Sequence, residues 1–272
     1  MHFNFDFSAR QILFTLTFAA QLVLLVVLLG RDRARRYPWF TASVALSALQ
    51  LMAEVLLTGR MATLPLKEIL FTLADLGVIV GLLVVVEVAR RAFAGAQRSQ
   101  WIVNGAGLLL VAAGLVVVWA PWPVWKQLVA NPATAALNIM LLVAAPGDSP
   151  TVFLGVDKGD LFLNLLLVQL GLLVVLFGRR FKAGWRSHAQ MIAIGLSTAA
   201  IAWLAVQAAW QSLAINAHLL PSAEQEHFLA LGTRLLNANS VVYLAVLVWW
   251  IAWLWLDEPG TAKTAAAETA PE

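Results

Sequence analysis

The chain has 272 residues, of which 61% are hydrophobic and 12% are charged. A soluble domain carries roughly twice that share of charged residues, and the mean hydropathy of +0.81 indicates an integral membrane protein. The absence of cysteine excludes disulfides, thiol catalysis and cysteine metal sites. The net charge of +3 does not indicate nucleic-acid binding, because the basic residues lie in short loops between apolar runs.

Seven apolar runs reach the length of about 20 residues that a helix needs to cross a bilayer. They are continuous rather than alternating, which favours helices over the strands of a closed barrel. We therefore predict an all-α polytopic membrane protein, a bundle of seven transmembrane helices that forms one domain over residues 1–256. The runs cover about 11–30, 38–58, 67–89, 101–120, 160–178, 189–211 and 235–256.

Lysine and arginine gather in every second loop between these runs. Cytoplasmic loops are enriched in basic residues, so we predict that the N-terminus is outside and the C-terminus is cytoplasmic. Residues 257–272 are rich in Ala, Thr, Glu and Pro, and we predict that they form a disordered cytoplasmic tail. The basic loops carry Arg31, Arg33, Arg35 and Arg36; then Arg90, Arg91 and Arg98; then Arg179, Arg180, Lys182 and Arg186.

The segment 131–146 (NPATAALNIMLLVAAP) is apolar but shorter than a span. If it crossed the membrane, the basic loop at 179–186 would lie outside, against the distribution of positive charge. We therefore expect an interfacial or re-entrant helix within an outer loop, 121–159.

The second run carries a stripe of polar residues on one helical face. They follow one another at spacings of four, three, four and four, which keeps them on the same side of a helix. Such a face should contact protein or water rather than lipid, because ionisable groups are costly in the membrane core. The stripe consists of Ser43, Ser47, Gln50, Glu54 and Thr58.

The third run has a shorter polar face, made of Glu68, Thr72 and Asp75. It ends at Asp75, and the residues after it on that face are apolar. Glu54 and Asp75 should thus both lie in the outer half of the membrane. Glu87, three and four residues before Arg90 and Arg91, is explained by a local helical ion pair.

Other runs add polar groups at a similar depth, among them Asn164 and Asn239, and Arg234 is the natural cation to meet a carboxylate. We predict a polar cavity that opens to the outside and is closed toward the cytoplasm. The alternative is a structural network in which polar side chains only hold helices together. The predicted ligand- or ion-binding residues are Glu54, Asp75, Arg234, Gln50, Thr72 and Asn237.

The sequence favours a protein that is not an enzyme. It contains no G-x-S-x-G, P-loop or H-E-x-x-H motif, and the run 235–256 has no lysine for a retinal Schiff base. We predict no cofactor, no metal and no catalytic residue.

Two further patterns concern helix packing and symmetry. Gly77 and Gly81 form a G-x-x-x-G pattern, which is typical of close helix packing. The similar segments LLVVLLGR (24–31) and LLVVLFGR (172–179) form a sequence echo, which would fit an internal repeat.

The pattern RRYPWF (35–40), then EVARRAF (87–93), then GRRFKAGWRSHA (178–189) resembles a group of uncharacterised bacterial seven-helix membrane proteins. The resemblance spans most of the helical region and is carried by basic and aromatic residues of the inner loops. It implies the seven-helix topology and a location in the bacterial inner membrane. It implies no residue roles.

Our first functional expectation is a membrane sensor or accessory subunit whose outer cavity binds a small ligand or ion. Its basic loops would dock a membrane or cytoplasmic protein partner, or anionic lipid of the bilayer. The alternative is a secondary transporter of a small solute, proton-coupled through Asp75. The docking residues would be Arg33, Arg35, Arg36, Arg179, Arg180 and Arg186.

Overall fold

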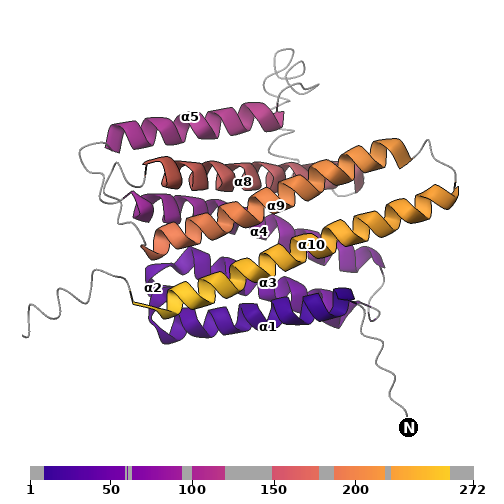
Figure 1. The fold of residues 1–272 in the computed structure, drawn as a ribbon, viewed down its shortest axis with the longest axis horizontal. Coiled ribbons are helices and arrows are strands. Elements are labelled where there is room, and N and C mark those ends of the chain that lie inside the picture. Colours follow the sequence, from indigo (N-terminus) through magenta and orange to yellow (C-terminus); the bar gives the residue numbers. More distant parts are fainter. Residues whose placement is uncertain are drawn as a thin grey trace, which may run out of the picture.

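The computed structural model describes residues 9–58, 60, 63–93, 100–119, 149–177, 187–217 and 222–257. Within these ranges the chain is helical and has no strand (Figure 1), which confirms the all-α prediction. Six helices are long and apolar enough to cross a membrane, as expected of a multi-pass membrane protein. They are α1 (Ala9–Gly30), α3 (Pro38–Leu57), α4 (Thr63–Ala92), α8 (Ser149–Phe177), α9 (His188–Ala217) and α10 (Ser222–Trp255).

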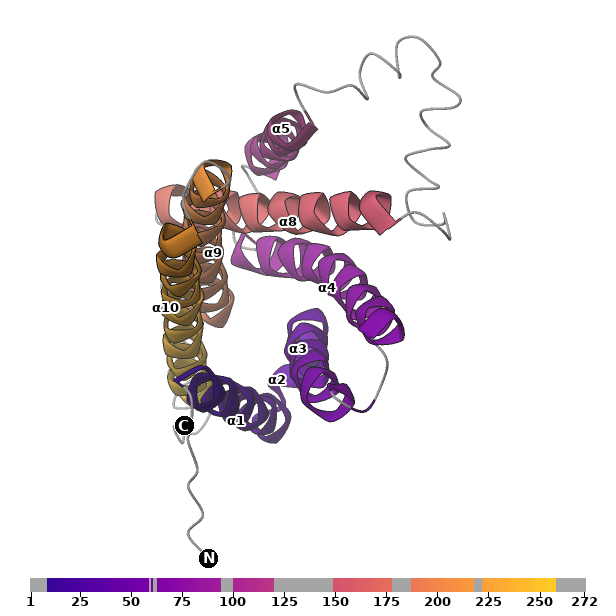
Figure 2. The same ribbon diagram turned by 90° about the vertical axis from the view of Figure 1, so that its right-hand side faces the viewer.

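These six helices form a closed ring. Each packs on the next in the order α1, α3, α4, α8, α9, α10, and α10 packs back on α1, while α4 also contacts α9 (Figure 2). A further helix, α5 (Gln100–Trp119), coincides with the predicted fourth run and lies outside the ring against α8. Its Gly114 faces the side chains of Phe162 and Leu165, which brings the two backbones close together.

Two pairs of neighbouring helices run parallel. Gly159 and Leu163 of α8 lie next to Val78 and Gly81 of α4, so the two helices advance in the same direction. Helices α1 and α10 are parallel as well, because residues 21 and 33 contact residues 243 and 257. The parallel pairing of α4 and α8 means that the chain between them returns along the bundle, and α5 is the described helix in that interval.

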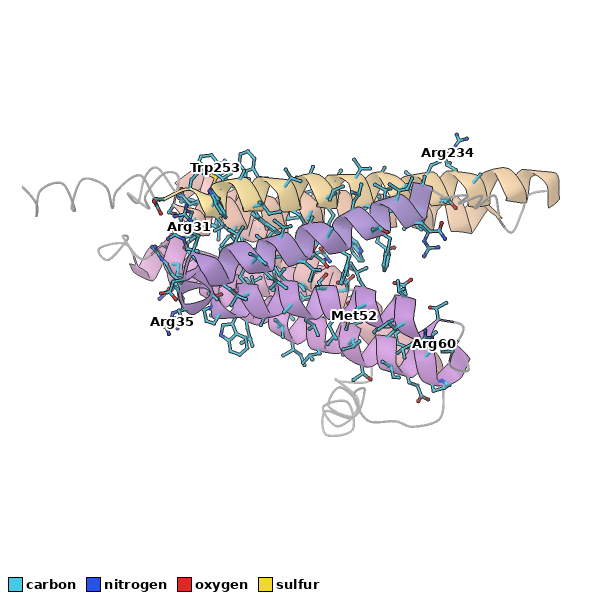
Figure 3. All side chains as sticks on the ribbon, turned by 90° about the horizontal axis from the view of Figure 1, so that it is seen from below. Arg31, Arg35, Met52, Arg60, Arg234 and Trp253 are labelled. Carbon is cyan, nitrogen blue, oxygen red and sulfur yellow. The ribbon has the colours of Figure 1, made fainter. Side chains whose placement is uncertain are left out.

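The buried apolar core lies toward one end of the ring. We call this the basic end, because it holds Arg31, Arg33, Arg35 and Arg36 and the C-terminus of α4 with Arg90 and Arg91. Arg60 and Arg234 lie at the opposite end, toward which α3 and α4 diverge from α1 and α10 (Figure 3). The fully buried core side chains include Leu24, Leu28, Phe40, Val84, Val88, Ile192, Leu247, Trp250 and Leu254.

The chain turns sharply between α1 and α3. Asp32 has a φ of 55°, in the left-handed region that aspartate tolerates better than most residues. The short helix α2 (Arg33–Arg36) follows, where the sequence analysis expected only a loop. Pro38 then begins α3, a position where its missing N–H costs no hydrogen bond.

Helices α8 and α10 extend past the predicted runs, although their candidate spans, Gly159–Phe177 and Ala230–Trp255, begin close to those runs. An outer loop was expected over 121–159, but residues 149–159 belong to α8, and α10 begins at Ser222 rather than near 235. Hydropathy detects only the apolar part of a helix, whereas Ser-Pro at 149 and Ser-x-x-Gln at 222 are typical helix starts. The segment 131–146, the tail 258–272 and the arginines at 179, 180 and 186 lie outside the described residues.

The sequence echo between α1 and α8 is not matched by their packing. Leu24, Val27 and Leu28 are buried in α1, whereas the aligned residues of α8, Leu172, Val175 and Leu176, are exposed. The echo therefore places the same residue types on opposite faces, and this burial pattern does not support an internal repeat in that register.

Helices α9 and α10 approach closely at Gly195, where we expect a methyl group to be destabilising. A Cβ there would overlap the indole nitrogen of Trp250, whose N–H donates to the carbonyl of Met191. Overpacking of this kind costs about 1–3 kcal/mol, so Gly195→Ala should lower the melting temperature in detergent. Gly77→Ala is the matched control, because nothing lies within 4 Å of a Cβ at that position. Equal shifts for the two variants would contradict the close packing.

Candidate functional site

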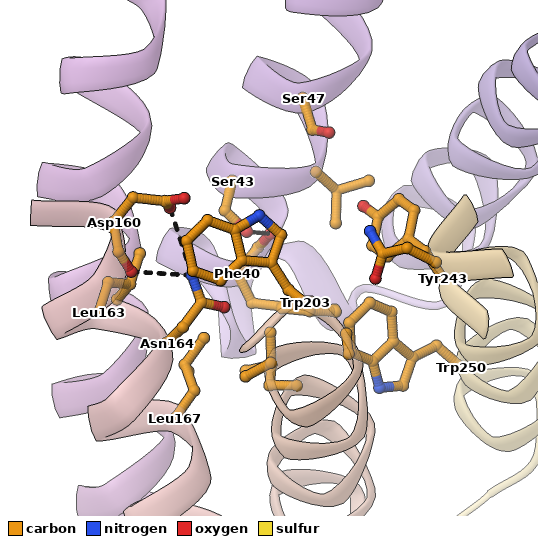
Figure 4. A pocket seen from close by; sticks show the side chains of 15 residues that line it. Phe40, Ser43, Ser47, Asp160, Leu163, Asn164, Leu167, Trp203, Tyr243 and Trp250 are labelled. Atoms are coloured by element: carbon orange, nitrogen blue, oxygen red, sulfur yellow. Dashed lines mark hydrogen bonds between the residues drawn. The ribbon is translucent and has the colours of Figure 1, made fainter. Parts of the chain in front are cut away.

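A cavity of about 390 Å³ lies inside the helix ring (Figure 4). Its volume is within the range of small-molecule sites, about 300–1,000 Å³. Four helices contribute to its wall, so a molecule inside it would contact both halves of the chain. The lining residues are Phe40, Ser43, Val44 and Ser47 from α3; Asp160, Leu163, Asn164 and Leu167 from α8; Leu196, Ala199, Ala200 and Trp203 from α9; and Asn239, Tyr243 and Trp250 from α10.

One part of the wall is polar. Ser43 and Ser47 come from the polar stripe found in the sequence, and Asn164 and Asn239 also reach the cavity. The amide nitrogen of Asn164 donates to the backbone carbonyl of Asp160 at 2.8 Å and to its carboxylate Oδ1 at 3.3 Å. The carboxylate therefore has a fixed neighbour one helical turn away, which limits its orientation.

Gln21 of α1 contacts two residues of the cavity wall, Ser47 and Tyr243. Its side chain is fully buried, and its amide nitrogen donates to the hydroxyl of Ser47 at 2.8 Å and of Tyr243 at 3.3 Å. Within the described residues its Oε1 has no hydrogen-bond partner. Exchanging the amide oxygen and nitrogen would leave the nitrogen unpaired instead, so one end of this amide is unsatisfied in either assignment.

The cavity has an aromatic wall toward the basic end. The rings of Phe40 and Trp250 meet edge to face, with centroids 5.0 Å apart. This arrangement is favourable because the positive edge of one ring faces the negative face of the other. Both side chains are fully buried, and below them lies the apolar core. The cavity is thus closed by packed side chains on that side.

Glu87 holds the start of α3 beneath this aromatic wall. Its Oε2 accepts a hydrogen bond from the backbone N–H of Phe40 at 3.0 Å, and its Oε1 lies 3.8 Å from Arg91. Arg91 also lies over the ring of Tyr37, 4.9 Å from its centroid. The predicted local ion pair is confirmed for Arg91, but the contact to Phe40 was not foreseen. A carboxylate at a helix N-terminus satisfies a free N–H and interacts favourably with the helix dipole.

The six residues predicted to bind a ligand do not line the described cavity. Glu54 is half-exposed near the opposite end and lies 3.9 Å from Arg10. The hydroxyl of Thr72 donates to the carbonyl of Glu68 within its own helix. Asp75 and Arg234 are exposed, and neither Glu54 nor Asp75 forms an ion pair with Arg234. Gln50 and Asn237 are half-buried. A ligand role for these residues stays a prediction.

Sequence reasoning missed Asp160 and Gln21. Asp160 is the first residue of the predicted run 160–178, and the sequence analysis gave it no role. Gln21 could have been found, since it is a lone amide near the middle of an apolar 22-residue helix. Such residues usually face protein rather than lipid.

The arginines at the basic end differ in their availability for a partner. The Arg33 side chain is 13% exposed, and it donates to the carbonyl of Leu256 and lies 3.4 Å from Asp257. Arg31 lies 3.7 Å from Asp257 and 5.0 Å from the ring centroid of Trp255. The Arg35 side chain is 88% exposed, and among the described residues its ion pair is with nearby Asp32. Arg33 therefore binds the end of α10, where a cation interacts favourably with the helix dipole.

Comparison with protein-family models, curated proteins and solved structures finds no match to this chain. The functional interpretation therefore depends on the geometry of the cavity and on the chemistry of its wall.

We expect Glu87→Ala to destabilise the protein, because it leaves the N–H of Phe40 without its acceptor in a buried place. An unsatisfied buried donor costs about 1–3 kcal/mol, so the melting temperature in detergent should fall by several degrees. Glu68→Ala, an exposed glutamate of the same helix, is the matched control and should change little. A Glu87→Ala variant as stable as the control would exclude this role.

Arg33→Gln should also destabilise the protein, whereas Arg35→Gln should not. Arg33 is mostly buried against the carboxyl end of α10, and Arg35 is solvent-exposed. The interaction of a partly buried cation with a helix C-terminus is worth up to about 2 kcal/mol. Thermal unfolding of the two variants side by side measures the difference in stability. A lower melting temperature for Arg35→Gln than for Arg33→Gln would contradict the stabilising contact between Arg33 and the carbonyl of Leu256.

Proposed function

We propose that this chain is a seven-helix membrane protein that binds a small ligand in its cavity and acts as a sensor or accessory subunit rather than an enzyme. The main support for this proposal is the cavity itself. Polar and aromatic residues of four helices line it, and a closely packed core lies next to it. A ligand there would alter the relative positions of helices from both halves of the chain. A ligand shifts a conformational equilibrium when it binds one arrangement of the helices more tightly than the other.

The parallel packing of α4 and α8 supports seven crossings. The chain must return along the bundle between them, and α5 has the length to do so. The segment 131–146 would then not cross, and the basic end would face the cytoplasm, as the distribution of arginine favours. The cavity would open toward the outside of a bacterial inner membrane.

A signal from the cavity would travel to the basic end through the packed half. Phe40 connects the cavity wall to Glu87, and Trp250 connects it to α9 through Met191. The exposed Arg35 and Arg36, with the predicted loop arginines Arg179, Arg180 and Arg186, would then dock a cytoplasmic partner or anionic lipid. Arg33 would serve the packing of α10 instead.

A secondary transporter is the second candidate. The helix ring supports it, because α1, α3 and α4 form one half and α8, α9 and α10 the other, with α5 as the link. Some transporter folds consist of two halves with the same orientation, related by an axis along the membrane normal. Solute uptake into proteoliposomes that is lost when the cavity is filled would favour this candidate, and binding without uptake would favour the sensor.

Filling the cavity should abolish ligand binding without unfolding the protein. Ala199 lines the cavity, so Ala199→Phe places a ring in the space that a ligand would occupy. Ala245→Phe adds the same ring at an exposed position of α10 and is the matched control. In a thermal-shift screen of small amines, amino acids, carboxylates and sugars, compounds that stabilise the wild type should stabilise the Ala245→Phe variant and not the Ala199→Phe variant. Equal stabilisation of both variants would contradict a ligand site in this cavity.

A further inference from the structure

We propose that the cavity binds a neutral ring compound with a carbonyl oxygen, and that the hydroxyls of Ser47 and Tyr243 both donate to this oxygen. The ring would lie against the aromatic and aliphatic part of the wall. The inference rests on the proposed function and names the chemical class of its ligand. It follows from the hydrogen bonds of one buried amide, from the composition of the wall and from its charge.

The amide of Gln21 holds these two hydroxyls close together. Its nitrogen donates to the oxygen of Ser47 at 2.8 Å and to the oxygen of Tyr243 at 3.3 Å. Ser47 belongs to α3 and Tyr243 to α10, and both line the cavity, whereas the fully buried Gln21 is not one of the lining residues. One buried side chain of α1 therefore positions two hydroxyls from different helices at the same cavity.

Each of these two hydroxyls keeps a hydrogen that it can donate. A hydroxyl group has one hydrogen and two lone pairs, and the amide of Gln21 uses a lone pair of each. Within the described residues, neither Ser47 nor Tyr243 donates its own hydrogen to an acceptor. The hydroxyl of Ser43 differs, because it donates to the carbonyl of Phe40 at 2.9 Å. The wall thus offers a pair of neighbouring donors at Ser47 and Tyr243.

The orientation of the Gln21 amide supports this count of hydrogens. If its oxygen and nitrogen were exchanged, both hydroxyls would donate to the oxygen, and the two N–H groups would be buried without acceptors. Buried N–H groups without partners are rarer than buried carbonyl oxygens without partners. The orientation in the structure leaves Oε1 as the unpaired atom of this amide. It is therefore the favoured one, and the two hydroxyls are donors toward the cavity.

A carbonyl oxygen on a ring complements this wall. It has two lone pairs and no hydrogen, so it can accept from both hydroxyls at once. The rest of the lining is mostly apolar and includes Phe40, Trp203 and Trp250, whose rings favour edge-to-face or offset contact with another ring. An apolar cavity of roughly 150 Å³ is enough to bind benzene. The volume of about 390 Å³ therefore leaves room for a substituted ring.

The charge of the wall favours a neutral ligand. Among the described lining residues, Asp160 is the one acid, and none is lysine, arginine or histidine. An anion would thus meet a carboxylate and no cation. The carboxylate of Asp160 accepts a hydrogen bond from Asn164 and has further interactions within the protein, so it does not require a cationic ligand.

The test uses the full-length protein in detergent and four probes that share a benzene ring. Acetophenone carries the carbonyl, ethylbenzene lacks it, benzylammonium is the cation and benzoate is the anion. Titration calorimetry measures binding, and the Ala199→Phe variant, with its cavity filled, gives the background from partition into detergent micelles. We expect acetophenone to bind the wild type above this background and more tightly than the other three probes.

Two variants locate the carbonyl within the cavity. Tyr243→Phe and Ser47→Ala each remove one hydroxyl, and each should weaken acetophenone binding about threefold to tenfold, the effect of one lost hydrogen bond. Neither should weaken ethylbenzene, whereas a general disturbance of the cavity would weaken both probes equally. Ser240→Ala is the matched control, because Ser240 lies outside the lining and donates to Leu236 of its own helix. The use of two helices keeps the test valid if one variant fails to fold.

The outcomes separate this inference from the proposed function. If ethylbenzene or benzylammonium binds as tightly as acetophenone and Ala199→Phe abolishes the binding, the cavity is a ligand site but not a carbonyl site, and the inference is wrong. Acetophenone binding that neither hydroxyl variant weakens, or that stays at background up to about 10 mM, where affinity is negligible, also overturns it. The proposed function fails only if the thermal-shift screen likewise finds no compound that distinguishes the Ala199→Phe variant from its control.

Discussion

The position of α3 in the bundle depends on the hydrogen bond from the backbone N–H of Phe40 to the carboxylate of Glu87. Helix α3 begins at Pro38, and its first N–H groups have no partner within the helix. Glu87, one of the few charged residues buried in the bundle, provides an acceptor from α4 at 3.0 Å. The contact fixes where α3 starts relative to α4, and it sets the position of Phe40 against Trp250. The closed side of the cavity depends on that pair.

The two ends of the bundle consequently differ in packing. Toward the basic end, apolar side chains fill the ring, and Arg33 holds the carboxyl end of α10. Toward the opposite end, α3 and α4 diverge from α1 and α10 (Figure 3). The cavity adjoins the packed half, with polar residues and aromatic residues on different parts of its wall.

Hydropathy predicted most of the fold because the bilayer demands long apolar helices. The predicted runs at 11–30 and 38–58 agree closely with α1 and α3. The predicted run at 160–178 agrees with the candidate span Gly159–Phe177, but α8 itself begins earlier, at Ser149, because hydropathy does not detect the less apolar part of a helix. Ser43 and Ser47 were placed on a polar face by their spacing, and both line the cavity. Glu54 and Gln50 share that spacing but lie farther along α3, beyond the cavity lining.

The sequence by itself determined that this is an all-helical membrane protein whose apolar helices carry polar residues on one face. Those conclusions follow from the length of apolar runs and from the periodicity of one helix at a time. Only the tertiary structure decided which polar faces meet. Gln21, Ser47 and Tyr243 come together from α1, α3 and α10, and Asp160 reaches the same cavity from α8. Periodicity defines the face of a helix but not its neighbour, because the order and rotation of packed helices are set by contacts between residues far apart in the chain.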